Sequence, residues 1–263
     1  MPADPLDVRW EEKRVLIIGR ASPEPSQKHI ETVCTGGITE DGQLLRLYPI
    51  SLRYLEEEKR YRLWSWAKFD VSKNPQDKRK ESYRVREDSI ALLAEVETWS
   101  ERFSLLRRAI VPDRETLDVR YHQDWTSMGV IEIEYLDFEQ RVREKNWERD
   151  KPYIKQFHLY TETKPLEQLP IDMRLRFRCK NNPKCRTHVS TLIGWEYMEA
   201  FRNFRTKYGT GQGAFSQIKG ALEGKFADPK RDAYALMGTH FKYGSWMVAQ
   251  LYFFEKTLPG RLF

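Results

Sequence analysis

The residues best suited to chemistry lie within 173–188, which holds two of the three cysteines and one of the five histidines. Cys179, Cys185 and His188 follow a Cys-x5-Cys-x2-His pattern around a turn-forming Asn-Asn-Pro sequence at 181–183. Structural zinc sites use thiolate and imidazole ligands of this kind and usually have four of them. The spacing therefore predicts three ligands of a metal site on a short knuckle (residues 179–188).

The fourth ligand must come from outside the knuckle. Cys34 is the only other cysteine of the chain, so we expect it to complete a Cys3His site. Such a site would bind zinc, and an iron–sulfur cluster is the alternative cofactor for the same residues. The competing interpretation is that all three cysteines are reduced structural thiols, because a buried cysteine also behaves as a small apolar side chain.

A row of cations accompanies the knuckle. The strand predicted over 173–179 alternates arginine with apolar residues, which places three guanidinium groups on one face. Like charges in a row repel unless an anion neutralises them, and a nucleic-acid backbone is such an anion. The alternative is a solvated edge strand guarded by its charge, or one paired with acidic residues of a neighbour. The basic strand (residues 174–186) comprises Arg174, Arg176, Arg178, Lys180, Lys184 and Arg186.

Two tryptophans form a second candidate surface. Trp64 and Trp66 alternate with Leu63 and Ala67 along a predicted strand and are flanked by cations. Aromatic rings between cations suit stacking on unpaired bases together with phosphate contacts. The alternative is that both rings are covered by a helix in a two-sided sheet.

Carboxylates give a weaker indication of catalysis. Asp150 with the Glu-Thr-Lys sequence of Glu162 and Lys164 resembles the arrangement with which metal-dependent nucleases hold Mg²⁺ and orient water. The same acidic-x-Lys pattern recurs at 11–13, 57–59 and 228–230, so it has little specificity. Whether the protein is an enzyme is left open by the sequence.

Composition limits the class of protein. The chain has 263 residues, of which 40% are hydrophobic and 13% aromatic, as expected of a folded protein. Its 45 Lys+Arg against 39 Asp+Glu give a net charge of +6, a mild basic bias. No apolar run is long enough to cross a bilayer, the first residues lack the apolar core of a signal peptide, and three cysteines do not make a disulfide scaffold. We expect a reduced, cytoplasmic protein without membrane contact.

Hydrophobic periodicity predicts an α+β fold. A β-rich, barrel-like N-terminal half contains a hairpin around residues 40–42, and apolar residues at helical spacing predict a long aromatic helix over 192–208. That helix is expected to pack a mixed sheet in the C-terminal half, with a second helix over 214–224. The charged segment 141–155 gives domains 1–150 and 151–263, which a Cys34 staple would fuse into one.

Together these features favour a nucleic-acid-binding protein that uses the basic strand beside the knuckle. A prokaryotic or phage system for nucleic-acid processing or defence is the context expected from this class alone. A metal-dependent nuclease or another nucleic-acid-modifying enzyme is one alternative. A protein-interaction module for an acidic partner is the second.

Overall fold

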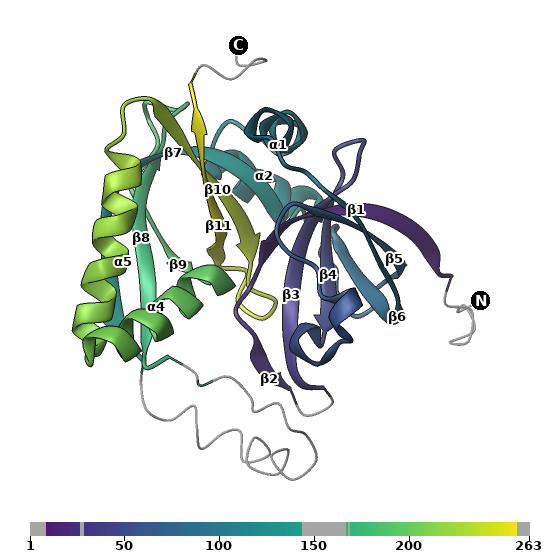
Figure 1. Cartoon of the computed structure of the whole chain (residues 1–263). Helices are drawn as coiled ribbons and strands as arrows, with labels where there is room; N and C mark the ends of the chain where they lie inside the picture. The colour runs from purple at the N-terminus through teal and green to yellow at the C-terminus, as the bar shows by residue number, and fades with distance from the viewer. Residues whose placement is uncertain (1–8, 27–28, 144–166, 168, 257–263) are drawn as a thin grey trace.

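The chain folds into two β-barrel domains with helices, shown in Figure 1. The computed structural model describes residues 9–26, 29–143, 167 and 169–256. Each domain is a closed, five-stranded, mixed β-barrel, and four α-helices occur within these residues, so the predicted α+β class is confirmed. In the same part of the chain no helix is both long and apolar enough to cross a membrane.

The N-terminal barrel has the strand order β1-β5-β6-β4-β3 and closes by pairing β1 with β3. β4 and β6 are its parallel pair, and β2 extends the sheet beside β3. The predicted hairpin joins β3 to β4, with Gly42 in the left-handed region at φ +90°. The strands are β1 (Glu11–Arg20), β2 (Glu24–Ser26), β3 (Ile30–Ile38), β4 (Leu44–Ile50), β5 (Ser65–Lys73) and β6 (Ser82–Glu95).

The C-terminal barrel has the order β10-β11-β9-β8-β7, with β9 and β11 parallel. The sheet predicted for this half therefore closes on itself. Along β8 the burial alternates, so Leu175, Phe177 and Cys179 face the interior. The strands are β7 (Met128–Val142), β8 (Ile171–Cys179), β9 (His188–Leu192), β10 (Arg231–Thr239) and β11 (Trp246–Glu255).

The helices α4 and α5 pack against this barrel, as Figure 1 shows, and α2 contributes Leu117 to the same core. Both were predicted: α4 ends where Gly209 takes a left-handed φ of +74°, and Thr210 then caps α5 by accepting the N–H of Gly213. Phe215 of α5 stacks on Phe138 of β7, with ring centroids 5.3 Å apart. The helices are α1 (Trp99–Leu106), α2 (Arg114–Asp124), α4 (Trp195–Tyr208) and α5 (Gly211–Phe226).

The chain passes between the barrels before residue 128. β7 pairs with both β8 and β10, so it belongs to the C-terminal barrel although it precedes the boundary placed at residue 150 from sequence. Residue 150 itself lies outside the described residues. The helices α1 and α2 occupy the connection between β6 and β7.

An apolar core joins the two barrels. Leu16 and Ile18 of β1 pack in one cluster with Leu236, Tyr252 and other residues of the C-terminal barrel. The Tyr252 hydroxyl donates a hydrogen bond to the carbonyl oxygen of Ile18. A Cβ built on Gly19 would lie 2.7 Å from Leu236 Cδ2, so glycine permits this close approach. The barrels therefore pack directly against each other.

Candidate metal centre

Four side chains converge where α2 meets the knuckle. Their ligand atoms all lie within 4.8 Å of one another. The cysteines and the histidine are buried, and the glutamate is half-buried. They come from the second residue of α2, the end of β8, the turn after it and the first residue of β9. This Cys/His/Glu cluster consists of Glu115, Cys179, Cys185 and His188.

A capping residue fixes α2 over the knuckle. Asp113 caps the helix, because one of its carboxylate oxygens accepts the N–H of Thr116 at 2.6 Å. Its other oxygen accepts a hydrogen bond from Asn182 Nδ2 at 2.9 Å. The carbonyl oxygen of Asn182 in turn accepts the N–H of Cys185 at 2.9 Å. One aspartate thus holds the helix start against the turn that carries the ligands.

Both sulfur atoms accept backbone hydrogen bonds. Cys179 Sγ accepts the N–H of Arg114 at 3.2 Å, and Cys185 Sγ accepts the N–H of Cys179 at 3.1 Å. Such donors stabilise a thiolate that binds a metal. Without a cation, burial raises the pKa of the Cys179 thiol, and the neighbouring Cys185 raises it further. A divalent cation would replace the protons that these buried sulfur atoms otherwise keep.

The histidine is held in its ligand form. Burial lowers the pKa of His188, and the nearby Glu115 carboxylate only partly opposes that shift. Neutral imidazole is the form that coordinates metals. His188 Nε2 lies 3.1 Å from Glu115 Oε1, so both would reach the same ion.

The donor set suits a structural zinc ion. Four protein ligands complete a tetrahedral shell, whereas catalytic zinc keeps one position for water or substrate. Iron–sulfur clusters are held mainly by four cysteines, or by two cysteines and two histidines. The cluster has two cysteines and one histidine. It therefore fits zinc better than an iron–sulfur centre.

Cys34 is not part of this cluster, so the prediction that it supplies the fourth ligand is corrected. Cys34 lies on β3 in the other barrel, where its Sγ accepts a hydrogen bond from Arg46 Nη1 at 3.6 Å. The fourth position belongs to Glu115. Glu115 is one of 39 acidic residues, and its distance in sequence from the cysteines matches no known spacing of metal ligands. Only the folded structure shows that it lies beside the knuckle.

Half of the basic strand is neutralised by carboxylates. Arg174 and Arg176 both contact Glu139 of β7, at 3.5 and 3.4 Å. Lys180 lies 2.7 Å from Glu132 and 2.5 Å from Asp232. The alternative of pairing with acidic residues of a neighbouring strand is therefore the arrangement found for these three cations.

The other half of the basic strand is exposed. Arg178, Lys184 and Arg186 are exposed and have no carboxylate partner among the described residues. Arg178 Nε makes one long hydrogen bond, 3.5 Å, to the hydroxyl of Thr187. Lys184 and Arg186 lie on the knuckle, and Arg178 lies just before it on β8.

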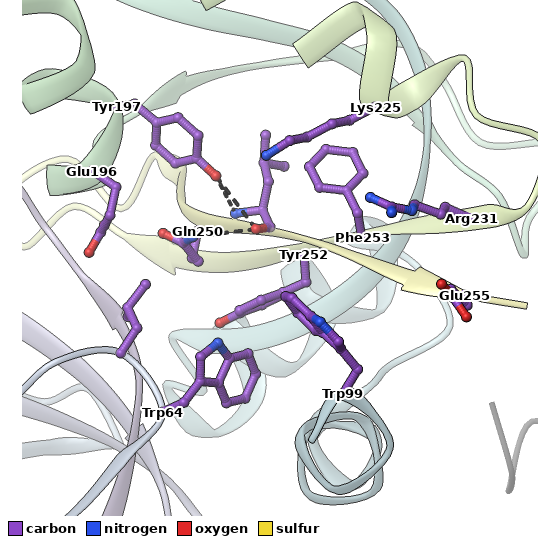
Figure 2. A pocket seen from close by; sticks show the side chains of 12 residues that line it. Trp64, Trp99, Glu196, Tyr197, Lys225, Arg231, Gln250, Tyr252, Phe253 and Glu255 are labelled. Atoms are coloured by element: carbon purple, nitrogen blue, oxygen red, sulfur yellow. Dashed lines mark hydrogen bonds between the residues drawn. The ribbon is translucent and has the colours of Figure 1, made fainter. Parts of the chain in front are cut away.

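The two tryptophans are core residues, so the predicted stacking surface is corrected. Trp64 and Trp66 are only 7% and 9% exposed and belong to the apolar core between the barrels. Trp64 precedes β5 with a left-handed φ of +68°, which breaks the alternation assumed from sequence. Figure 2 shows Trp64 in the wall of a pocket of about 370 Å³ together with Trp99 and Tyr252. Neither of these two rings is exposed enough to stack on a row of bases.

The catalytic candidates cannot be placed. Asp150, Glu162 and Lys164 all lie outside the described residues.

The fold and this site define a two-barrel α+β protein with a metal-type Cys/His/Glu cluster in its second barrel. Residues 114–262, more than half of the chain, match a family model described as a domain of unknown function (DUF8757), so the chain belongs to that family. Residues 11–108 match a second model with the same description (DUF8758). Residues 109–113, just before α2, separate the two matches. No curated protein matches the chain.

Proposed function

We propose that this protein binds nucleic acid through the surface of its knuckle, which a zinc ion holds in shape. One observation carries the proposal: Arg178, Lys184 and Arg186 are exposed beside the cluster and lack a carboxylate partner within the described residues. Unpaired cations on a fixed surface are suited to phosphate contacts, because each contact releases counterions from the nucleic acid.

The metal contributes by ordering the turn. The knuckle has no regular secondary structure between β8 and β9, so an ion in the cluster would help to fix Lys184 and Arg186, whereas Arg178 is already positioned by β8. A binding surface that is ordered before it meets its partner loses less entropy on binding. The ion would therefore act on affinity without contacting the nucleic acid. Three unpaired cysteines agree with the reducing, cytoplasmic setting that we infer for the protein.

The test compares two triple variants that lose the same charge. Binding to single- and double-stranded DNA and RNA oligonucleotides is measured by fluorescence anisotropy over a range of salt concentrations. The R178A/K184A/R186A variant is expected to bind at least about tenfold more weakly. The slope of log affinity against log salt concentration should become less steep, by an amount that corresponds to at most about three lost phosphate contacts.

The matched control is R174A/R176A/K180A, which removes the cations that are already paired. It should bind almost as tightly as the wild type. Equal losses in both variants would mean that only net charge matters. Absence of salt-dependent binding by the wild type would refute the proposal outright.

A further inference from the structure

A second pocket lies between the two barrels and shares no residue with the Cys/His/Glu cluster. It has a volume of about 450 Å³. One wall is formed by β3, β4 and the segment before β6, and the other includes the end of β10 and parts of α4 and β11. Four arginines and two carboxylates line it. The arginines outnumber the carboxylates of the lining, so the partner of each arginine decides whether its charge is free for a ligand.

Three of these arginines are already neutralised. Arg79 forms an ion pair with Asp77 at 2.7 Å, and Arg143 pairs with Asp172 at 2.5 Å. Arg202 pairs with Glu199. The charges of these three arginines are therefore already balanced and do not require an anionic ligand. The fourth arginine, Arg46, has no such ion pair within the described residues.

Arg46 is a buried guanidinium, 6% exposed, with no carboxylate in direct contact among the described residues. Its Nη2 donates to the carbonyl oxygen and the hydroxyl of Ser127, at 3.1 and 3.2 Å. The nearest compensation is indirect, because Ser127 donates its own hydroxyl to Glu81 at 2.7 Å. Arg46 Nε has no hydrogen-bond partner within the described residues. A buried charge with an unused donor is costly unless a ligand completes it.

Thr239 presents a second unused group. It is 1% exposed, and its Oγ1 is a buried atom without a hydrogen-bond partner in the part of the chain described. Its backbone is satisfied, since its N–H donates to Ser127 and its carbonyl oxygen accepts from Arg79. Only the hydroxyl remains free. Both orphaned groups, on Arg46 and Thr239, thus belong to residues of one pocket.

The other residues that line the pocket suit a planar, partly polar ligand. Tyr48 and Phe241 are large aromatic residues of the pocket that remain 41% and 63% exposed. His240 Nδ1 accepts the backbone N–H groups of Lys242 and Tyr243, which leaves Nε2 as the protonated donor. Aromatic faces bind planar rings, and convergent polar groups fix their orientation.

We propose that this pocket binds a small organic anion, a planar body bearing a phosphate or carboxylate whose oxygens accept from Arg46 and Thr239. The volume matches the lower range of small-molecule sites. Arginine is the side chain that best matches the geometry of both oxyanions. This inference is independent of the nucleic-acid surface, since it concerns a different part of the molecule.

The probes are the four nucleoside monophosphates in one arm and 4-hydroxybenzoate in the other, titrated into the full chain by calorimetry. Uncharged nucleosides and inorganic phosphate are the comparison ligands. At least one anionic probe should bind with Kd below about 1 mM, and the matching ligand without its anion should bind about tenfold more weakly. The arm that binds identifies the oxyanion. Failure of both arms to bind would overturn the proposal.

The decisive variant is Thr239→Val, which removes one hydroxyl and keeps the shape. Because that hydroxyl has no partner among the described residues, the substitution should leave the melting temperature unchanged or higher. Affinity should fall about tenfold. Thr191→Val on β9, outside the pocket, is the control and should bind as the wild type does. Arg46→Met should abolish binding, but it also removes the contact with Ser127, so Thr239→Val decides. Unchanged affinity in Thr239→Val refutes the assignment.

Cys34 supplies an independent readout of location. It lines this pocket and is partly exposed, whereas Cys179 and Cys185 are buried. A saturating probe should slow the modification of Cys34 by N-ethylmaleimide several-fold. An unchanged rate would show that the probe binds elsewhere, and the proposal would fail.

Discussion

Glu115 Oε1 lies 3.1 Å from His188 Nε2, although 73 residues separate them in the chain. The contact joins the first turn of α2 to the first residue of β9. Glu115 thereby becomes the fourth potential ligand beside Cys179, Cys185 and His188, although no spacing in the local sequence indicates it. The Cys/His/Glu cluster is therefore formed by the second barrel together with the helix that precedes it, and it does not tie the two barrels together.

The first prediction concerns which residues hold the metal. Cys185→Ala should lose most of the bound zinc, because it removes a thiolate from the cluster. Glu115→Ala should weaken zinc binding by about 10–100-fold or more, the loss typical even of residues that only orient ligands. Elemental analysis after purification and dialysis against a weak chelator measures both.

Cys34→Ala is the matched control for this prediction, since it also removes one thiol. It should retain the zinc content of the wild type, because Cys34 lies on β3 and outside the cluster. Loss of zinc in Cys34→Ala alone would restore the Cys3His site inferred from sequence and would contradict the assignment of Glu115.

The second prediction concerns metal removal. An ion present at one thousand times its Kd stabilises the folded state by about 4 kcal/mol. For a chain of this size that corresponds to a shift of about 8–16 °C in melting temperature. A strong chelator should therefore lower the Tm of the wild type by several degrees, as followed by differential scanning calorimetry. The Cys179→Ser variant should already melt lower and should not respond to the chelator; an equal response would mean that the chelator acts elsewhere.

Features that depend on residues close together in the sequence could be predicted, whereas features that depend on distant residues could not. The helices α4 and α5 were predictable because apolar spacing and Gly209 are local features. The inward position of Cys179 followed from strand alternation along β8. Closure of each barrel was harder to predict, because the pairs β1–β3 and β7–β10 join strands that are not neighbours in the chain.

The residues of the candidate site likewise differ in whether local sequence could predict them. Cys179, Cys185 and His188 are close in sequence, and the structure brings them together. Trp64 was misplaced because a left-handed residue just before β5 interrupts the strand period, and nothing in the alternation signals it. Arg46 and Thr239 were not found at all, since a single buried cation and a single unpartnered hydroxyl become visible only when both barrels are folded and packed.

The third prediction concerns acid stability and the pair of Asp77 with Arg79, whose side chains are 5% and 10% exposed. Burial raises the pKa of Asp77, but hydrogen bonds from Arg79 and Ser82 outweigh it, so the pKa lies below its ordinary value. A depressed pKa stabilises the fold above the unfolded value of about 3.9, and that stability is lost as the pH falls below it.

Asp77→Asn should therefore be less stable than the wild type by about 1–3 kcal/mol at pH 7. The difference should shrink as the pH falls from about 5 toward 2. Urea unfolding at several pH values measures this. The exposed Asp88→Asn serves as the control and should keep the wild-type profile. A difference between Asp77→Asn and the wild type that stays constant with pH would contradict the assignment.

The fourth prediction contrasts two glycines, one just before α4 and one inside α5. A Cβ on Gly194 would lie 2.5 Å from the carbonyl oxygen of Ala249, a backbone atom that cannot move aside. Gly194→Ala should therefore force α4 away from β11 and destabilise the protein by about 1–3 kcal/mol. A Cβ on Gly220, inside α5, meets nothing within 4 Å.

Gly220→Ala should instead stabilise the protein by about 0.5–1 kcal/mol, because alanine loses less backbone entropy than glycine when a helix forms. Both free energies of unfolding are measured by urea titration under the same conditions. The two variants add the same methyl group, so opposite signs isolate the close packing at Gly194 from the general effect of replacing glycine. Equal signs would show that α4 can shift without cost, and the wall of the interdomain pocket that α4 provides would then be adjustable.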